Sequence, residues 1–358
     1  MNRSIVDLPD LVGALPEAER RLFDRLFRVT VSVGRLRPPA EMEPWIVKTF
    51  GALEPVLTQK IIRVTNLITL ETTLYNELRA RRPMEARAPA DILAEIEKNA
   101  GDPLCYPLTG TPEDIFGRVE GRFSVSASNV AKYDEFSGLV VFKEHNPLAI
   151  EAEKVVDYLD VAWRWLEAAH RTEPPARFPF ILWNCLWKSG ASLIHGHLQM
   201  VLARDLPYGK VEALRRTLID YRTRFESGFL EDLYAVHQAL GLSLPPRNGV
   251  RGLVYLTPIK EREVLLWADR PGEALWFGLG RLLEAYVRDL GAQAFNVGVY
   301  LPPFGDRDGW EEFPALVRVV DRGDPANRTA DFAGMELYAA SVVAADPFPV
   351  AQRLQELW

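Results

Sequence analysis

Residues 192–199, Ser-Leu-Ile-His-Gly-His-Leu-Gln, constrain the fold of this chain more than any other stretch. They hold two of the five histidines in 358 residues. Side chains alternate between the two faces of a β-strand, so a strand over 194–203 has two different faces. One face gathers groups that donate, accept or attack, namely His195, His197 and Gln199. The other face is apolar, as in a hydrophobic core, and consists of Ile194, Leu198 and Met200. The pattern predicts a functional site built on a rigid strand.

The composition is that of an ordinary globular protein. Hydrophobic residues make up 48% and charged residues 25% of the chain, which excludes wholesale disorder. Two cysteines are too few for a disulfide framework and favour a cytoplasmic protein. No apolar run reaches the ~18–20 residues that span a bilayer, and the N-terminus lacks a signal-peptide core. We therefore expect no membrane partner.

The net charge of −7 narrows the range of ligands. An acidic surface does not attract nucleic acid in general, so we expect no nucleic-acid partner. A phosphorylated ligand would need a local positive pocket. The candidate is the run Arg79-Ala80-Arg81-Arg82-Pro83.

The apolar pattern indicates an α+β chain in three regions. Residues 1–100 are predicted to form a mainly helical arm packed on the rest. Residues 101–245 form a first unit, in which an amphipathic helix separates two pairs of strands and a long helix closes the unit. The strands are predicted at 123–128, 138–142, 180–186 and 194–203, and the helices at 152–170 and 210–240.

Residues 246–358 repeat this scheme in a degenerate form. The segment 252–256 resembles 138–142, and an apolar-striped helix is predicted at 272–290. Strands follow at 294–300 and 315–320, the last in the place of the motif strand. We therefore predict two tandem halves of one fold, each an antiparallel sheet with flanking helices, with the chemistry confined to the first half.

A histidine in this setting can act as a nucleophile. A useful fraction of imidazole is unprotonated near neutral pH, and it can attack phosphorus and then leave again. Such a ring needs an acceptor on its far nitrogen and a donor near the phosphoryl oxygens, and Gln199 could be that donor. The turn Lys188–Ser192 could cradle phosphate oxygens with its backbone N–H groups. Because His-x-His on a strand also binds metals, a metal-dependent enzyme with His195 and His197 as ligands stays open.

The stretch 184–199 resembles the active-site segment of the galactose-1-phosphate uridylyltransferase family. That family belongs to the nucleotidyltransferase branch of the histidine triad superfamily. The shared pattern is an Asn, then Gly-x-Ser, then His-x-His-x-Gln, and the spacing here is the same. It is carried by Asn184, Gly190, Ser192, His195, His197 and Gln199. Other segments follow in the family's order, namely Arg79–Pro83, Asp102–Tyr106, Asn129, Phe142–His145 and Phe332–Glu336.

The resemblance implies a role for each catalytic position. His197 would be the nucleophile that accepts the nucleotidyl group, and Gln199 would contact the transferred phosphoryl oxygens. His195 would be a supporting residue or a zinc ligand. Ser192 would contact a phosphate of the acceptor, and Asn184 the surroundings of the nucleophile.

The remaining positions would bind substrate. Arg79 and Arg82 would reach the nucleotide phosphates, Asn129 would lie near the nucleoside, and Glu336 would contact the sugar. Gly190 would belong to the phosphate-binding turn.

The resemblance implies zinc only in part. Cys105, His145 and His195 are three candidate ligands, whereas a structural zinc wants four. The family's second zinc cysteine would fall at Leu108, which cannot bind a metal. The paired histidines of the family's second half have no counterpart around 313–320.

Two departures from the family leave the substrate open. Gly196 replaces the proline usual between the histidines. Leu198 before Gln199 is similar to diadenosine tetraphosphate phosphorylases, which transfer AMP to phosphate and need no such metals.

The expected function is transfer of a nucleoside monophosphate from a nucleotide-sugar to a sugar phosphate through a covalent nucleotidyl-histidine. One alternative is a phosphorylase of a dinucleoside polyphosphate or nucleotide-sugar. A second alternative is a histidine triad hydrolase. A third is a nucleotide-binding protein without activity, which the pairing of His197 with Gln199 disfavours. The resemblance to this family also implies a homodimer, in which each chain contains two histidine-triad-like halves.

Overall fold

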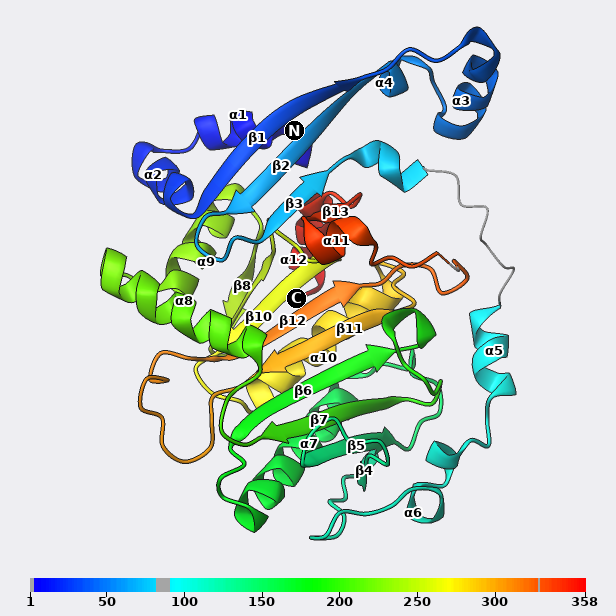
Figure 1. The fold of residues 1–358 in the computed structure, drawn as a ribbon, viewed down its shortest axis with the longest axis vertical. Coiled ribbons are helices and arrows are strands. Elements are labelled where there is room, and N and C mark those ends of the chain that lie inside the picture. The colour runs from blue at the N-terminus through cyan, green and yellow to red at the C-terminus, as the bar shows by residue number, and fades with distance from the viewer. Residues whose placement is uncertain (1–2, 82–90, 328) are drawn as a thin grey trace.

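The computed structural model describes residues 3–81, 91–327 and 329–358, and in it the chain builds two sheets (Figure 1). The larger sheet is antiparallel, with strand order β4-β5-β7-β6-β11-β12-β10-β9-β8. Its strands are β4 (Ser124–Ser128), β5 (Phe136–Phe142), β6 (Phe178–Cys185), β7 (His197–Ala203), β8 (Ser243–Arg247), β9 (Val250–Val254), β10 (Glu261–Ala268), β11 (Phe295–Tyr300) and β12 (Ala315–Asp321).

The larger sheet is a tandem repeat, as predicted. In the first half the strand order is β4-β5-β7-β6, and α7 (Ala152–Thr172) connects β5 to β6. In the second half the order is β9-β10-β12-β11, and α10 (Glu273–Arg288) connects β10 to β11. The halves join through the antiparallel pair β6–β11, which makes one continuous sheet. The α+β architecture with two tandem halves is therefore confirmed.

One predicted equivalence between the halves is wrong. Segment 252–256 overlaps β9, which corresponds to β4 and not to the strand at 138–142. The equivalent of β5 is β10, which the sequence pattern did not reveal. Strand β10 begins Glu-Arg-Glu, and this charged start hides a strand whose Glu263 is fully buried. Charge at a buried position breaks the apolar signal that strand prediction uses.

The N-terminal arm contains its predicted helices and also a sheet. The helices are α1 (Leu8–Gly13), α2 (Glu17–Leu26), α3 (Glu43–Phe50), α4 (Glu54–Leu57) and α5 (Ile92–Lys98). Three strands were not expected in this region, namely β1 (Phe27–Arg35), β2 (Thr58–Asn66) and β3 (Thr72–Tyr75). They form a second sheet that β13 (Ser341–Val343) completes in parallel with β3. In Figure 1 the long β1–β2 ribbon, in blue, extends away from the larger sheet.

The predicted helix at 210–240 is two helices, α8 (Gly209–Phe225) and α9 (Phe229–Leu240). The chain turns between them, where Glu226 has a left-handed backbone with φ of 52°. The remaining helices are α6 (Pro107–Gly110), α11 (Gly334–Tyr338) and α12 (Pro347–Leu357). Within the described residues, every helix is too short or too polar to cross a membrane.

Candidate active site

The motif strand has the two faces that alternation predicts, although β7 begins at His197 and not at 194. Leu198 and Met200 belong to the main hydrophobic core on one face. On the other face His197 and Gln199 lie opposite Val141 and Leu139 of β5. The ladder extends one residue beyond β7, because the Phe142 N–H donates to the carbonyl of Gly196. The site therefore lies on a strand held on both edges.

His197 presents one nitrogen for chemistry. Its side chain is buried, and Nδ1 donates to the carbonyl oxygen of His195 at 2.8 Å. That bond places the proton on Nδ1 and leaves the lone pair on Nε2, which bonds to no described residue. Burial lowers the pKa of His197, and the hydrogen bond to His195 opposes this. The ring is therefore neutral near neutral pH, as a nucleophile must be.

The side-chain amide of Gln199 has hydrogen-bonding capacity that the described residues leave unsatisfied. Its side chain is 9% exposed, and Oε1 has no hydrogen-bond partner among the described residues. A buried polar atom without a partner costs roughly 1–3 kcal/mol. Because the two ends of a glutamine amide are interchangeable in assignment, either end can face a ligand. Such an atom beside a free imidazole nitrogen indicates a place for a polar ligand.

Four potential metal ligands converge next to His197. They are Asp102, Cys105, His145 and His195, and their ligand atoms all lie within 4.8 Å of one another. Cys105 Sγ is 3.3 Å from Nδ1 of both His145 and His195, and the two Nδ1 atoms are 3.0 Å apart. The Asp102 carboxylate is 3.8 Å from His195 Nδ1. Ligand atoms around tetrahedral zinc lie roughly 3.3–3.8 Å apart, so the cluster has the size of such a site.

The surroundings orient both imidazoles toward the centre of this cluster. His145 Nε2 donates to the carbonyl of Ile96, and His195 Nε2 donates to that of Phe142, each at 2.8 Å. These bonds fix the tautomer that leaves each Nδ1 lone pair free, as in metal-binding histidines. The Gly101 N–H points at Cys105 Sγ at 3.3 Å. The donor set fits zinc in number, chemistry and orientation.

The structure offers a candidate for the fourth ligand, Asp102, which the sequence pattern did not supply. We placed the family's cysteine pair at Cys105 and Leu108, whereas the structure brings Asp102 and Cys105 together. Leu108 is exposed. Asp102 looked like a simple cap, and it does cap the turn 103–105 by accepting the N–H groups of Leu104 and Cys105. The Asp-x-x-Cys spacing was the signal that could have found it.

Position 196 has no room for a side chain. An added Cβ would lie 2.5 Å from the Phe142 ring, and the Gly196 N–H donates to the carbonyl of His145. A proline would lose that hydrogen bond. Here the backbone of Gly196 joins the ends of the two strands that carry the histidines.

The turn 188–192 differs from a phosphate cradle. The N–H groups of Ser189, Gly190 and Ala191 already donate to carbonyls within 186–187. Gly190 takes the left-handed conformation that ends the turn, with φ of 96°. Ser192 is exposed and forms no hydrogen bond with the described residues. If this segment contacts a phosphate, Ser192 is the residue left to do so.

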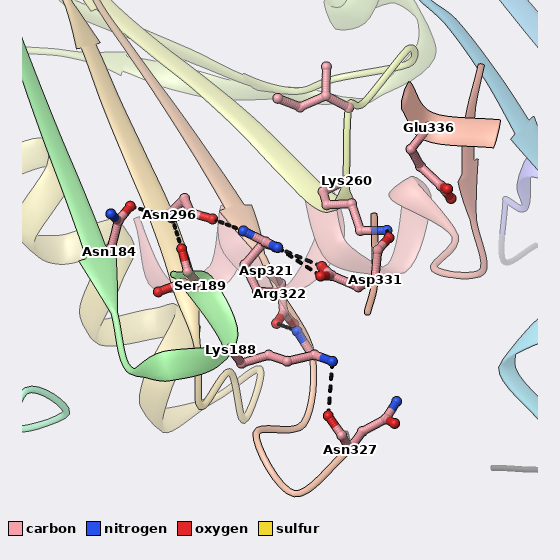
Figure 2. A network of polar contacts seen from close by, with 12 residues as sticks. Asn184, Lys188, Ser189, Lys260, Asn296, Asp321, Arg322, Asn327, Asp331 and Glu336 are labelled. Carbon is pink, nitrogen blue, oxygen red and sulfur yellow. Dashed lines mark hydrogen bonds and ion pairs between the residues drawn. The ribbon is translucent and has the colours of Figure 1, made fainter. Parts of the chain in front are cut away.

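Asn184 connects the motif strand to the second half. The β6–β7 ladder ends at the pair Leu182–Gln199, and the same register continued by two residues would bring Asn184 opposite His197. Asn184 pairs on its other side with Asn296 of β11. Asn296 Nδ2 donates to Asn184 Oδ1 at 2.6 Å (Figure 2). The polar row therefore crosses the boundary between the halves.

Of the predicted substrate residues, the structure brings Arg79 and Glu336 to one cavity. This cavity has a volume of about 530 Å³ and is also lined by Lys188, Lys260 and Arg322. Asn129 lies at the end of β4, half-buried, and its Oδ1 accepts the Ala131 N–H. Arg82 lies outside the described residues.

The comparisons with known proteins identify the fold. No family model and no curated protein matches the chain. Solved structures do match. An ADP-glucose phosphorylase from Arabidopsis thaliana with bound ADP-glucose superposes with a TM-score of 0.61 over 81% of this chain and 96% of its own, at 14% identity.

Two further structures agree with it. A GalT-like protein from Arabidopsis thaliana gives a TM-score of 0.57, with 73% of this chain and 93% of that chain covered, at 14% identity. A uridylyltransferase gives 0.56, with 83% and 98% covered, also at 14% identity. The chain therefore has the fold that these structures share, the fold of a GalT-like protein and a uridylyltransferase.

Proposed function

We propose that this protein is a nucleotidyltransferase that works through a covalent nucleotidyl-histidine on His197. The observation that carries the proposal is the imidazole itself. Its Nδ1 proton is bound to the carbonyl of His195, its Nε2 lone pair is free, and the unsatisfied amide of Gln199 lies on the same strand face. This is the arrangement that attack on phosphorus requires.

Two displacements complete the reaction. In the first, His197 Nε2 forms a bond to the α-phosphorus of the donor, and the bond from phosphorus to the bridging oxygen breaks. The leaving phosphate takes that electron pair. In the second, an oxygen of the acceptor phosphate attacks the same phosphorus and the N–P bond breaks. The imidazole is then neutral again, with its Nδ1–H still donating to the His195 carbonyl.

The donor that we propose is a nucleotide-sugar and the acceptor a sugar phosphate. The second candidate is phosphorolysis, with orthophosphate as acceptor. It is favoured by Leu198 before Gln199 and by the fold likeness to a phosphorylase that binds ADP-glucose. Hydrolysis would hand the same intermediate to water. All three share the first displacement and differ only in what attacks second.

The covalent intermediate is the direct test. The full chain is incubated with ADP-glucose, UDP-glucose or diadenosine tetraphosphate, kept at alkaline pH, and analysed by intact mass and peptide mapping. We expect one added nucleoside monophosphate on His197, absent in His197→Asn and present in the matched control His170→Asn. His170 is half-buried at the end of α7, outside the site. No adduct with any donor, or an adduct that persists in His197→Asn, overturns the proposal.

The acceptor is identified from the preformed adduct. Glucose 1-phosphate, orthophosphate or buffer alone is added, and the released nucleotide is analysed. A nucleotide-sugar product supports transfer, a nucleoside diphosphate supports phosphorolysis, and a free monophosphate supports hydrolysis.

We also propose that Asp102, Cys105, His145 and His195 hold a structural zinc ion. The support is their mutual distance and the two Nε2–H bonds that direct each Nδ1 inward. When bound, the ion would supply a cross-link between the segment 102–105 and the ends of β5 and β7. The chain's own part is to fix His195, whose carbonyl orients the ring of His197.

Metal content tests this site. We expect about one zinc per chain in protein purified without chelator. Cys105→Ala should remove it, and Cys185→Ala, which changes a buried thiol elsewhere, should not. Equal metal content in the two variants contradicts the assignment.

A further inference from the structure

Lys188, Lys260 and Arg322 converge on the cavity that Arg79 and Glu336 line. The cavity is also lined by Arg262 and by the carboxylates of Glu261, Asp321, Asp324 and Asp331. Lys188 follows β6, Lys260 precedes β10, and Arg322 follows β12. Figure 2 shows Arg322 between Asn296 and Asp331, with Lys260 above it and Lys188 below it in this view. The cluster is thus assembled from loops at one end of the larger sheet, and two of its members come from the second half.

Within the described part of the chain, the two ammonium groups donate hydrogen bonds to backbone carbonyls only, and Lys260 Nζ also lies 5.4 Å from the centroid of the Phe332 ring. Lys260 is 5% exposed, and its Nζ donates to the carbonyl of Asp331. Lys188 Nζ donates to the carbonyls of Asn327 and Thr329. Among the described residues, no carboxylate lies within ion-pair distance of either nitrogen. A desolvated cation without an opposite charge is unfavourable, so the cluster can gain from an added anion.

The third cation, Arg322, differs from the two lysines because it has a carboxylate partner. It is paired with Asp331 in a bidentate fashion, with both N–O distances at 2.7 Å. That pair is neutral as a unit, so an added anion would find its charged donors in Lys188 and Lys260. The pKa of Lys188 is lowered by burial and by the charges of Arg322 and Lys260, although Asp331 opposes the effect. The cations therefore lie close enough to repel one another.

The strand register relates the cluster to the nucleophile. Asn184 pairs with Asn296, and the β6–β7 ladder ends at the pair Leu182–Gln199. If this register is continued by two residues, Asn184 falls opposite His197, and at about 4.8 Å per strand the Asn296 backbone would be roughly 10 Å from that of His197. Arg322 Nη1 donates to Asn296 Oδ1. The cluster therefore lies on the second-half side of His197, beyond Asn296.

We propose that Lys188, Lys260 and Arg322 bind a second phosphoryl group at the far end of the leaving group and of the acceptor. The inference rests on the proposed function, because His197 defines the near end. It narrows the acceptor from any sugar phosphate to one phosphorylated at both ends, whose two phosphates are separated by a sugar ring. The Lys188 and Lys260 ammonium groups then exchange neutral carbonyl partners for a charged one, which gives stronger hydrogen bonds.

The alternative is that these cations only hold Asn327, Thr329 and Asp331 in place. Direct binding separates the two explanations without any need for the covalent step. Glucose 1,6-bisphosphate and glucose 1-phosphate are titrated calorimetrically into the full chain, its Lys260→Met variant and its Lys210→Met control. Lys210 is exposed in the first turn of α8, away from this cavity.

We expect the wild type and Lys210→Met to bind the bisphosphate about tenfold or more tightly than the monophosphate. Lys260→Met should lose this preference, and Lys260→Arg should retain it. If Lys260→Met does not fold, as judged by its thermal transition, Lys188→Met takes its place. Equal affinity of the wild type for both sugars, or an unchanged preference in the Met variant, overturns the inference.

The two proposals fail separately. A missing adduct on His197 overturns the proposed function and leaves the calorimetric preference as measured. Equal binding of the two sugars overturns the anion subsite and leaves the adduct as measured.

Discussion

The two halves place different residues at equivalent positions of the same sheet. Gln199, Leu182, Gly298 and Arg318 lie in one row across β7, β6, β11 and β12. The halves meet at β6–β11, so β6 corresponds to β11 and β7 corresponds to β12. Gln199 of β7 and Arg318 of β12 are therefore equivalent positions. His197 lies two residues before Gln199, and Leu316 lies two residues before Arg318. The second half therefore carries Leu316, which cannot attack phosphorus, where the first half carries His197, the proposed nucleophile.

The second half uses its polar positions to hold the molecule together. Arg318 Nε bonds to Glu263 at 2.6 Å and Nη1 to Glu71 at 2.8 Å. Tyr255 donates to the other oxygen of Glu71 at 2.7 Å. Glu71 precedes β3, so this cluster joins the N-terminal arm to the larger sheet. The comparison teaches that one frame carries two kinds of polar site: histidines and an unsatisfied amide in the first half, and in the second an ion cluster that lines a cavity of about 340 Å³.

The largest expected effect separates His197 from its counterpart Leu316. His197→Ala should reduce nucleotidyl transfer by about 10⁴-fold or more, because the covalent route is lost. It should leave the folded state intact. Leu316→Ala should retain the activity and lower the free energy of unfolding by about 2–5 kcal/mol, because Leu316 is 2% exposed. Steady-state kinetics and urea unfolding measure the two effects. A catalytic loss in Leu316→Ala would break the division between the halves.

The next effect tests the buried ion cluster. Arg318→Met leaves two carboxylates without their cation, and Glu263 is fully buried. Removing one partner of such a cluster costs about 3–5 kcal/mol. Urea unfolding should show this loss.

An exposed ion pair of the first half is the control for Arg318→Met. Arg204 is paired with Glu135 at 2.8 Å on the surface, and Arg204→Met should change the unfolding midpoint little. Equal losses in the two variants would mean that the cluster at Arg318 is no better than a surface pair.

The sequence predicted the first half better than the second, and the reason is physical. Alternation across β7 predicted the faces of His197 and Gln199, because strand geometry alone sets them. Strand β10 was missed because its charged residues are neutralised by partners distant in sequence, such as Arg318 with Glu263. The sheet of the arm was missed for a similar reason, since β13 joins β3 from the other end of the chain.

The candidate site shows the same limit. The histidine motif is local, so its pattern is visible in one segment. Asp102 as a fourth ligand, and Lys188 beside Lys260, depend on loops that only the fold brings together. A sequence pattern carries no information on such distances.

A third effect compares His197 with His237, which is also buried and also donates from Nδ1 to a backbone carbonyl. His237 Nε2 additionally accepts the Leu256 N–H at 3.2 Å, so its lone pair is occupied. Burial lowers the pKa of His237 to about 4, and the Leu233 carbonyl opposes this. The neutral ring therefore contributes stability that is present above the unfolded pKa of about 6.5.

That stability is lost as the pH falls from about 6.5 to about 4, because the unfolded state binds the proton first. The loss attributable to His237 should be about 3 kcal/mol. Urea unfolding at a series of pH values measures it against His237→Gln. We expect the free energy of unfolding to depend less steeply on pH in His237→Gln, because one proton fewer is bound on unfolding. Identical slopes in the two proteins would show that His237 titrates normally in the folded protein.

The smallest effect tests how tightly the halves are joined behind the sheet, where α7 packs on α10. A Cβ at Gly280 would lie 2.6 Å from the Ala152 Cα, which is backbone and cannot move aside. Gly280→Ala should therefore lower the free energy of unfolding by about 1–3 kcal/mol. Gly278→Ala, on the same helix, meets only the Trp358 ring at 3.2 Å. There the gain in helix propensity, up to about 1 kcal/mol, offsets the contact. If both variants are as stable as the wild type, the two helices can separate, and the halves are less rigidly coupled than the continuous sheet implies.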